Sequence, residues 1–203
     1  MDELFNKIKN YTPDILDSND YRKYSVLIPI IQKNGELHIL FEVRSLQLRN
    51  QPGEICFPGG RIDSSDASAR DAAIRETTEE LRIPANTIEN VYPIDYIIQP
   101  LGRRMIFPFV GFIKNNDLIS PNPSEVKEIF TVPLPFLQSA EPKVYELSLK
   151  VEPERDFPFD LIPGGENYKW RKRGMKEYFY FYQDYCIWGL TALILRNFLS
   201  IIK

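Results

Sequence analysis

The sequence predicts an α/β fold in which one mixed sheet is covered by helices. Two observations support this prediction. Runs rich in β-forming residues are interspersed with helix-type segments along the 203 residues, without internal repeats, a pattern typical of a sheet packed against helices. Hydrophobic residues make up 43% and charged residues 26% of the chain, an ordinary globular balance. We therefore expect residues 1–203 to form a single domain.

The first half of the chain contains clear element signals. An amphipathic helix is expected from Asp2 to about Asn10. Strands over Tyr24–Gln32 and Leu37–Arg44 flank Asn34-Gly35, the strongest short hairpin signal. A loop punctuated by glycine and proline then leads to a helix over Ser68–Leu81. An S-x-x-D capping box at residues 68–71 begins this helix.

The second half reads as strands followed by a terminal helix. Four further strands are expected over Ile88–Ile98, Met105–Lys114, Glu128–Val132 and Lys143–Val151. Residues 152–176 are rich in proline and charge and are predicted to form an inserted loop. An aromatic strand over Tyr178–Tyr182 and a helix over residues 184–202 complete the chain.

Composition excludes several functional classes. A net charge of -3 offers no basic surplus for nucleic acid or anionic lipid. The single histidine, His38, lies in a strand-like run without a G-x-S-x-G motif, which excludes a Ser-His-Asp site. Cys56 and Cys186 lack a metal-ligand spacing and indicate free thiols in a reducing compartment. The N-terminus lacks a signal-peptide core, and the apolar stretch Tyr185–Leu195 is too short to cross a bilayer. We expect a cytoplasmic protein without membrane or nucleic-acid partners.

Three glutamates gather on one face of the helix expected over Ser68–Leu81. Glu76, Glu79 and Glu80 have the i, i+3, i+4 spacing that directs side chains to one side. A cation among them would convert their mutual repulsion into binding energy. Because no histidine or thiolate is near, these hard oxygen ligands favour Mg²⁺ or Mn²⁺ over zinc. Arg75, one turn before Glu79, can hold that carboxylate in place.

A solvated acidic helix face is the alternative for the Glu79-Glu80 pair, since such pairs are common on exposed helices. The glycines Gly59-Gly60 upstream favour a ligand site instead. Paired glycines permit positive φ and let the backbone approach a ligand closely. A glycine loop that leads into a carboxylate-bearing helix places carbonyl oxygens and carboxylates around one ion.

The segment Gly60–Ile83 resembles the Nudix box. The matching residues are Gly60, Asp66 in the position of the first glutamate, Arg75-Glu76, Glu79-Glu80 and Ile83. There are three departures. One additional residue precedes Arg75, Thr77 replaces an aliphatic residue, and Arg82 replaces the glycine after the helix. That last position often needs positive φ, and none of the departures affects the metal carboxylates.

The residues before the box identify a branch of this family. In order and spacing, Arg44-Ser45, Arg49, Gly53 and Phe57-Pro58-Gly59-Gly60 resemble the motif that marks the coenzyme A diphosphatases of the Nudix superfamily. The segment from Ile187 to Ala192 also resembles the terminal helix of that branch. The resemblance covers roughly residues 24–200. It implies a Nudix-type α/β/α sandwich with a mixed β-sheet.

The resemblance implies metal-dependent hydrolysis of the diphosphate bond of coenzyme A, or of a derivative, to 3′,5′-ADP and 4′-phosphopantetheine or its derivative. The implied residues fall into three groups. They are Glu79, Arg75 and Glu125 for catalysis, Glu76, Glu80, Glu79 and Gly60 for the Mg²⁺ or Mn²⁺ ion, and Arg44, Arg49 and Gly59 for the substrate. Either Glu79 or Glu125 would accept the proton of the attacking water. The arginines match phosphate oxygens, because a guanidinium can donate two parallel hydrogen bonds.

Two alternatives stay open. One is a Nudix diphosphatase that acts on ADP-ribose or a dinucleotide. The other is a non-catalytic Nudix-fold module that binds a ligand, against which the intact Arg75-Glu76 and Glu79-Glu80 pairs count. In each case the partner is a small nucleotide-like molecule. The sequence also leaves open whether the protein is a monomer or a homodimer.

Overall fold

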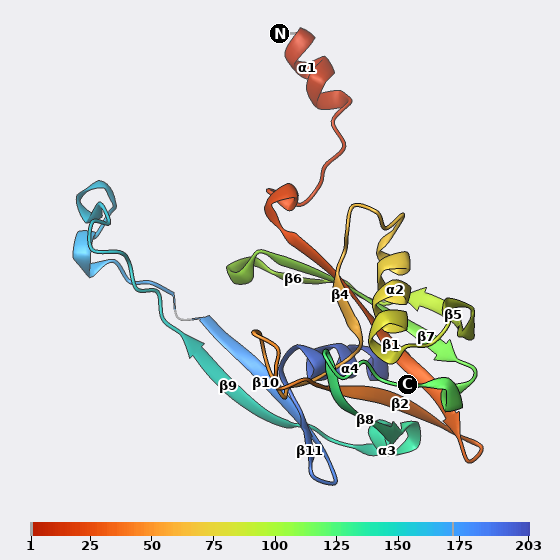
Figure 1. The fold of residues 1–203 in the computed structure, drawn as a ribbon. Coiled ribbons are helices and arrows are strands. Elements are labelled where there is room, and N and C mark those ends of the chain that lie inside the picture. Colours follow the sequence, from red (N-terminus) through yellow and green to blue (C-terminus); the bar gives the residue numbers. More distant parts are fainter. Residues whose placement is uncertain (1, 172) are drawn as a thin grey trace. The chain divides into compact units, whose positions relative to one another are not determined.

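The computed structural model describes residues 2–171 and 173–203 (Figure 1). The chain divides into two compact units. The first unit comprises the residues up to Ile30 together with Pro58–Asn122, and the second comprises Ile31–Phe57 together with Pro123–Lys203. Each unit combines helices with strands, so the predicted α/β class is confirmed.

The first unit contains most of a mixed sheet and one helix that packs on it. Its elements are α1 (Asp2–Lys9), β1 (Arg22–Lys33, whose last three residues belong to the second unit), β4 (Gly59–Arg61), α2 (Ala69–Leu81), β5 (Ile88–Pro93), β6 (Ile97–Gln99) and β7 (Arg104–Ile113). β4 pairs antiparallel with β1, and β5 and β6 pair antiparallel with β7. β1 and β7 are neighbours that run in the same direction, because Arg22 N–H donates to Arg103 O and the Ser25 hydroxyl donates to Phe107 O. The expected mixed sheet is thus present.

The second unit contains β2 and its neighbours, a three-stranded sheet and the terminal helix. Its elements are β2 (Glu36–Arg44), β3 (Ile55–Cys56), β8 (Val126–Pro133), α3 (Leu134–Ser139), β9 (Lys143–Leu149), β10 (Arg173–Tyr182), β11 (Tyr185–Ile187) and α4 (Gly189–Ile201). β2 pairs antiparallel with β3 and β8. β10 pairs antiparallel with β9 and β11, and β9 and β10 form a long ribbon in Figure 1.

Short 3-10 helices connect these elements. They cover Ser18–Asp20, Ala85–Thr87, Pro100–Gly102, Asn116–Leu118, Phe159–Leu161 and Gly165–Asn167. Each unit has its own apolar core. In the first unit Leu27, Ile28 and Leu81 are fully buried, and in the second Phe41 and Leu195 are fully buried. Burial of this kind is the main force that holds the elements together.

Several predicted elements are confirmed. The helix over Ser68–Leu81 is present as α2, and the first helix is present as α1. At the predicted hairpin, Asn34 and Gly35 have φ values of 53° and 82°, as a type I′ turn requires. Among the described residues, no helix is long and apolar enough to cross a membrane. Neither Cys56 nor Cys186 forms a disulfide within the described residues.

The terminal helix begins at Gly189, later than the predicted start at Asp184. Tyr185–Ile187 instead pairs with β10 as β11, and Gln183-Asp184 forms the two-residue turn between the two strands. Gln183 has a φ of 51°. An aromatic, β-forming run has a partner strand available here, and the cross-strand pairing overrides the helical reading.

The predicted inserted loop over residues 152–176 is shorter than expected. β10 begins at Arg173, five residues before the predicted strand, and pairs with β9 from Arg173 to Phe179. The irregular segment is therefore the connection of a long hairpin. The strand predicted over Ile88–Ile98 is split into β5 and β6. The short β3, β4 and α3 were not predicted, because two to six residues carry too little periodicity.

Candidate functional site

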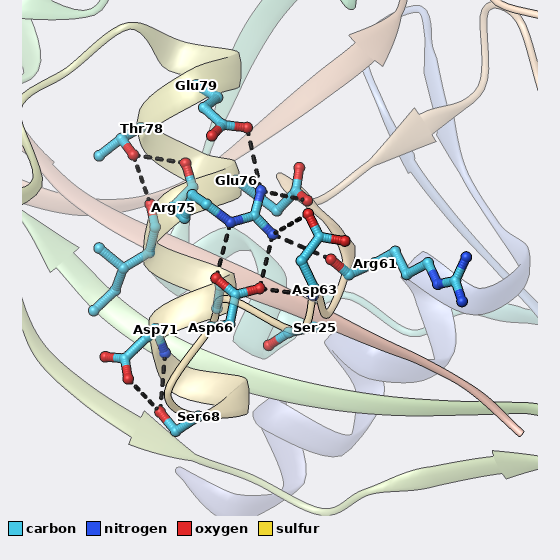
Figure 2. Close-up of polar contacts among 12 residues, drawn as sticks. Ser25, Arg61, Asp63, Asp66, Ser68, Asp71, Arg75, Glu76, Thr78 and Glu79 are labelled. Carbon is cyan, nitrogen blue, oxygen red and sulfur yellow. Dashed lines mark hydrogen bonds and ion pairs between the residues drawn. The ribbon is translucent and has the colours of Figure 1, made fainter. Parts of the chain in front are cut away.

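Helix α2 of the first unit begins where its sequence predicts. Ser68 is the N-cap, and its hydroxyl oxygen accepts a hydrogen bond from Asp71 N–H at 3.2 Å. The Ser68 hydroxyl also lies 2.8 Å from an Asp71 carboxylate oxygen (Figure 2). A cap of this kind satisfies backbone donors that the first turn leaves unpaired. It fixes the start of the helix and thereby the directions of the glutamates that follow.

The helix ends at Leu81 although Arg82 replaces the glycine of the family pattern. Arg82 adopts a left-handed φ of 52°, which costs a non-glycine residue about 1–2 kcal/mol. Local hydrogen bonds support this end of the helix. Asn122 N–H donates to Glu80 O at 2.8 Å, and the Arg82 guanidinium donates to the Asn122 side-chain oxygen at 2.9 Å. The helix-end geometry is therefore retained without glycine.

The glycine loop lies directly against two glutamates of α2. Gly59 N–H donates to Glu80 Oε2 at 2.8 Å, and Glu80 is buried. A side chain at Gly60 would occupy the space of the Glu76 carboxylate, and one at Gly59 would overlap the Ser25 carbonyl oxygen. Glycine is thus required at position 59 by the neighbouring backbone, and at position 60 it leaves the space in which the Glu76 carboxylate lies.

Arg75 hydrogen-bonds to three carboxylates of the same region. Its guanidinium donates to both oxygens of Asp66, at 2.9 and 3.0 Å, and to Glu76 Oε1 at 2.9 Å. It also donates to Glu79 Oε2 at 3.3 Å and to the Arg61 carbonyl at 3.2 Å. Figure 2 shows the guanidinium surrounded by these groups. A two-oxygen contact of this kind fixes both distance and plane, so Asp66 orients Arg75, which in turn holds Glu76.

The charges in this cluster are unequally stabilised. The hydrogen bond from Arg75 lowers the pKa of Asp66, whose side chain is 5% exposed. The same contact with Asp66 raises the pKa of Arg75. Burial raises the pKa of Glu76 above its usual range, Arg75 opposes the rise, and the charges of Glu79 and Asp63 add to it. Glu76 is therefore a carboxylate whose negative charge is incompletely compensated, which favours a cation beside it.

The residues of this region fit a hard divalent ion in their chemistry. Glu76, Glu80 and the glycine backbone offer oxygen donors of the kind that Mg²⁺ and Mn²⁺ prefer. Glu79 is 55% exposed and its contact is with Arg75. In the described part of the chain no three acidic, histidine or cysteine side chains converge as a ready-made metal cluster. Of the three predicted glutamates, Glu76 and Glu80 lie at the glycine loop and Glu79 contacts Arg75.

The predicted substrate-binding arginines and Glu125 belong to the second unit. At the end of β2, Arg44 N–H donates to Glu54 O, and Gly53 N–H donates to Arg44 O. Ser45 N–H donates to Glu125 O at 2.8 Å, so Glu125 lies beside the arginine at the level of the backbone. The loop between these contacts carries the exposed Arg49.

Arg44 itself is half-buried. Its Nε is buried and has no hydrogen-bond partner among residues 2–171 and 173–203. A buried donor without a partner costs free energy, and an anionic ligand would remove that cost.

Sequence reasoning missed some participants. Asp63 lies 3.8 Å from the Arg75 guanidinium and raises the pKa of Glu76. The Asp63 N–H donates to Asp66 Oδ2 at 2.8 Å, which shapes the loop before α2. Asp63 and Asp66 have a turn-type spacing that could have suggested this local bond. Their joint contact with Arg75 depends on the fold and has no signal in the sequence.

Comparisons with known proteins point to one family. The NUDIX domain family matches residues 21–150. The peroxisomal coenzyme A diphosphatase of Mus musculus is 38% identical over 136 residues, which are 66% of this chain and 56% of that protein. The chain thus spans a little over half the length of the mouse relative.

A second relative matches over almost the whole chain. The Nudix hydrolase NudL of Escherichia coli (strain K12) is 28% identical over 199 residues, 97% of this chain and 92% of NudL. Among solved structures, the NUDIX domain of Shewanella oneidensis NrtR, complexed with ADP ribose, has a TM-score of 0.47 at 15% identity. That match covers 68% of this chain and 87% of the other.

Proposed function

Because this chain belongs to the Nudix domain family, we propose that it is a metal-dependent diphosphatase acting on coenzyme A or one of its derivatives. The products would be 3′,5′-ADP and 4′-phosphopantetheine or its derivative. The observation that carries this proposal is the run from Arg44 to Gly60, which resembles the coenzyme A diphosphatase motif. The identity to the mouse coenzyme A diphosphatase supports the same branch.

Glu76, Glu80, Glu79 and the Gly60 backbone would hold the divalent ion, Mg²⁺ or Mn²⁺. When bound, such an ion neutralises the diphosphate and lowers the pKa of a water molecule that attacks phosphorus. The protein would prepare these ligands beforehand. Arg75, oriented by Asp66, keeps the Glu76 carboxylate beside Gly60. This arrangement reduces the reorganisation that ion binding requires.

The remaining roles concern the substrate and the proton. Arg44 and Arg49 would bind substrate phosphates, since guanidinium groups pair with phosphate oxygens in a fixed plane. The Gly59 backbone would allow close approach of the substrate. Glu79, which is exposed and can move, or Glu125 would accept the proton of the attacking water.

The test is product analysis after incubation of purified protein with coenzyme A, ADP-ribose and dinucleotides, with and without Mg²⁺ or Mn²⁺. We expect metal-dependent release of 3′,5′-ADP from coenzyme A. Rapid turnover of ADP-ribose without turnover of coenzyme A would refute coenzyme A as the substrate, and the proposal of a diphosphatase would still hold. If none of these diphosphates is cleaved with either metal, the protein is a ligand-binding module.

A further inference from the structure

The second unit contains a cavity of about 610 Å³ whose wall includes Gly53 of the motif, but none of the residues proposed above for the metal, the substrate phosphates or the attacking water. Its walls come from β2, the segment 52–55, β8 and the chain from Gln183 to Trp188. Val43 lines this cavity, whereas the next residue, Arg44, does not. The arginine side chain that we assign to substrate phosphates is therefore not part of the cavity wall.

Every ionisable side chain on the cavity wall that carries charge at neutral pH is acidic. These residues are Glu54, Glu128 and Asp184. Glu54 accepts a hydrogen bond from the neutral amide of Gln51 at 2.7 Å, which leaves its charge uncompensated. Lys127 Nζ lies 3.4 Å from Glu128 Oε1, and this is the only ion pair within 4 Å that the described residues form with the three carboxylates. A concave surface of one sign concentrates the electrostatic field and attracts ions of the opposite sign.

Two aromatic side chains complete the wall. Tyr185 stacks on Phe130, with ring centroids 3.6 Å apart and planes within 3°. Trp188 stacks on Phe179 at 5.9 Å and remains 44% exposed. Rings held by stacking present fixed π faces, and a cation is attracted to such faces when it lies within about 6 Å.

A metal ion is a poor occupant for this cavity. No three acidic, histidine or cysteine side chains in the described residues converge as metal ligands, and a hard divalent ion requires several converging oxygen atoms. The apolar wall, which includes Val43 and Ile55, suits methylene groups. Two negative charges remain after Lys127 is set against the three carboxylates.

We propose that the cavity binds a small aliphatic polyamine. Its ammonium groups would pair with Asp184, Glu128 and Glu54, one of them against the face of Trp188 or Tyr185, while its methylene chain covers the apolar wall. The cavity shares Gly53 with the motif, but none of the catalytic, metal-binding or phosphate-binding residues proposed above lies on its wall, so failure of this proposal would leave the hydrolytic function untouched.

The chain has two tryptophans, Trp170 and Trp188, so the variant Trp170→Phe leaves Trp188 as its single fluorescent indole. We would titrate this variant with spermidine in metal-free buffer at constant ionic strength and follow the fluorescence. A saturable change with one site per chain is expected, with calorimetry as a second readout. Asp184→Asn and Glu128→Gln should each raise the Kd about fivefold, the effect of losing one partly exposed ion pair.

Asp160→Asn is the matched control, since Asp160 is an exposed acid outside the cavity wall. It should leave the Kd unchanged. The proposal is overturned if spermidine gives no saturable signal, or if Asp184→Asn and Asp160→Asn have equal effects. It is also overturned if Mg²⁺ at the same total charge produces the same fluorescence change, because the cavity would then attract any counter-ion.

Discussion

The proposed catalytic region and the proposed substrate-binding region differ in how their charged side chains are compensated. In the first unit, the carboxylates of Asp66, Glu76 and Glu79 share an internal counter-ion, Arg75. In the second unit, Arg44 is half-buried and its Nε has no hydrogen-bond partner among the described residues. A partly balanced cluster keeps its shape before any ligand binds, whereas an unbalanced cation depends on a ligand for its partner. Substitutions in the two regions should therefore have different effects on activity.

The largest effect is expected from Glu80→Gln in the first unit. The change keeps an oxygen that can accept the Gly59 hydrogen bond but removes a proposed metal ligand. Turnover of every diphosphate substrate should fall by about a hundredfold or more, because the loss affects the ion and leaves substrate recognition intact. Steady-state kinetics on coenzyme A, dephospho-coenzyme A and ADP-ribose would measure it.

Glu141→Gln is the control for this measurement, because Glu141 is exposed and plays no part in the cluster. Its kinetics should equal those of the wild type. A Glu80→Gln protein that retained full activity on any of these substrates would remove Glu80 from the metal site. The difference in charge compensation between the two regions would then have no bearing on catalysis.

A smaller and more selective effect is expected from Arg44→Ala and Arg49→Ala in the second unit. A charge-assisted hydrogen bond contributes about 1.5–3 kcal/mol, so kcat/KM for coenzyme A should fall roughly ten- to hundredfold. Dephospho-coenzyme A lacks the 3′-phosphate and should be less sensitive to whichever arginine binds that group. A panel of kcat/KM values across both substrates would reveal the pattern.

Arg155→Ala serves as the control, since Arg155 is an exposed arginine outside the motif. This substitution should leave kcat/KM unchanged for both substrates. Arg44→Ala and Arg49→Ala could instead reduce kcat/KM equally for both substrates, and by as much as Glu80→Gln does. The arginines would then act on the fold or on the metal site. Selective recognition of the 3′-phosphate would then be excluded.

The elements that sequence predicted well are those governed by neighbours along the chain. Ser68 caps α2 through Asp71, three residues away, and Asn34-Gly35 forms the hairpin turn. Rules of capping and turn conformation apply at that range. The spacing of Glu76, Glu79 and Glu80 predicted that all three would face the glycine loop. Glu76 and Glu80 do so, whereas Glu79 is exposed and contacts Arg75.

What sequence could not provide depends on pairs brought together by folding. Arg75 meets Asp66 nine residues away across a loop, and Tyr185–Ile187 became a strand because β10 was available as a partner. The left-handed conformation of Arg82 also depends on contacts, since Asn122 lies forty residues further along the chain. Such tertiary partners override local propensity.

The smallest effect concerns the stability of the metal-free cluster. Burial raises the folded-state pKa of Glu76 above its ordinary value, against the opposing effect of Arg75. The folded protein therefore binds more protons than the unfolded chain between these two pKa values, and stability is lost as pH rises through that window. Glu76→Gln cannot ionise and should escape this loss. Near neutral pH and without metal, the variant should melt at a higher temperature than the wild type, by about 2–4 °C for each kcal/mol gained.

The pH and metal dependence of this difference identify its cause. Below the ordinary pKa range of a glutamate the two proteins should melt together, because Glu76 is then protonated in both folded and unfolded wild type. Added Mg²⁺ should raise the melting temperature of the wild type, with a gain of about 2.7 kcal/mol at a hundredfold excess over Kd, and should raise that of Glu76→Gln less. Glu166→Gln, at an exposed position, is the control and should follow the wild type throughout. If Glu76→Gln melts below the wild type near neutral pH without metal, the ion pair with Arg75 outweighs burial. The charges of the first region would then compensate one another within the protein, as in a structural salt bridge. The evidence for an uncompensated carboxylate that needs a metal ion would be lost.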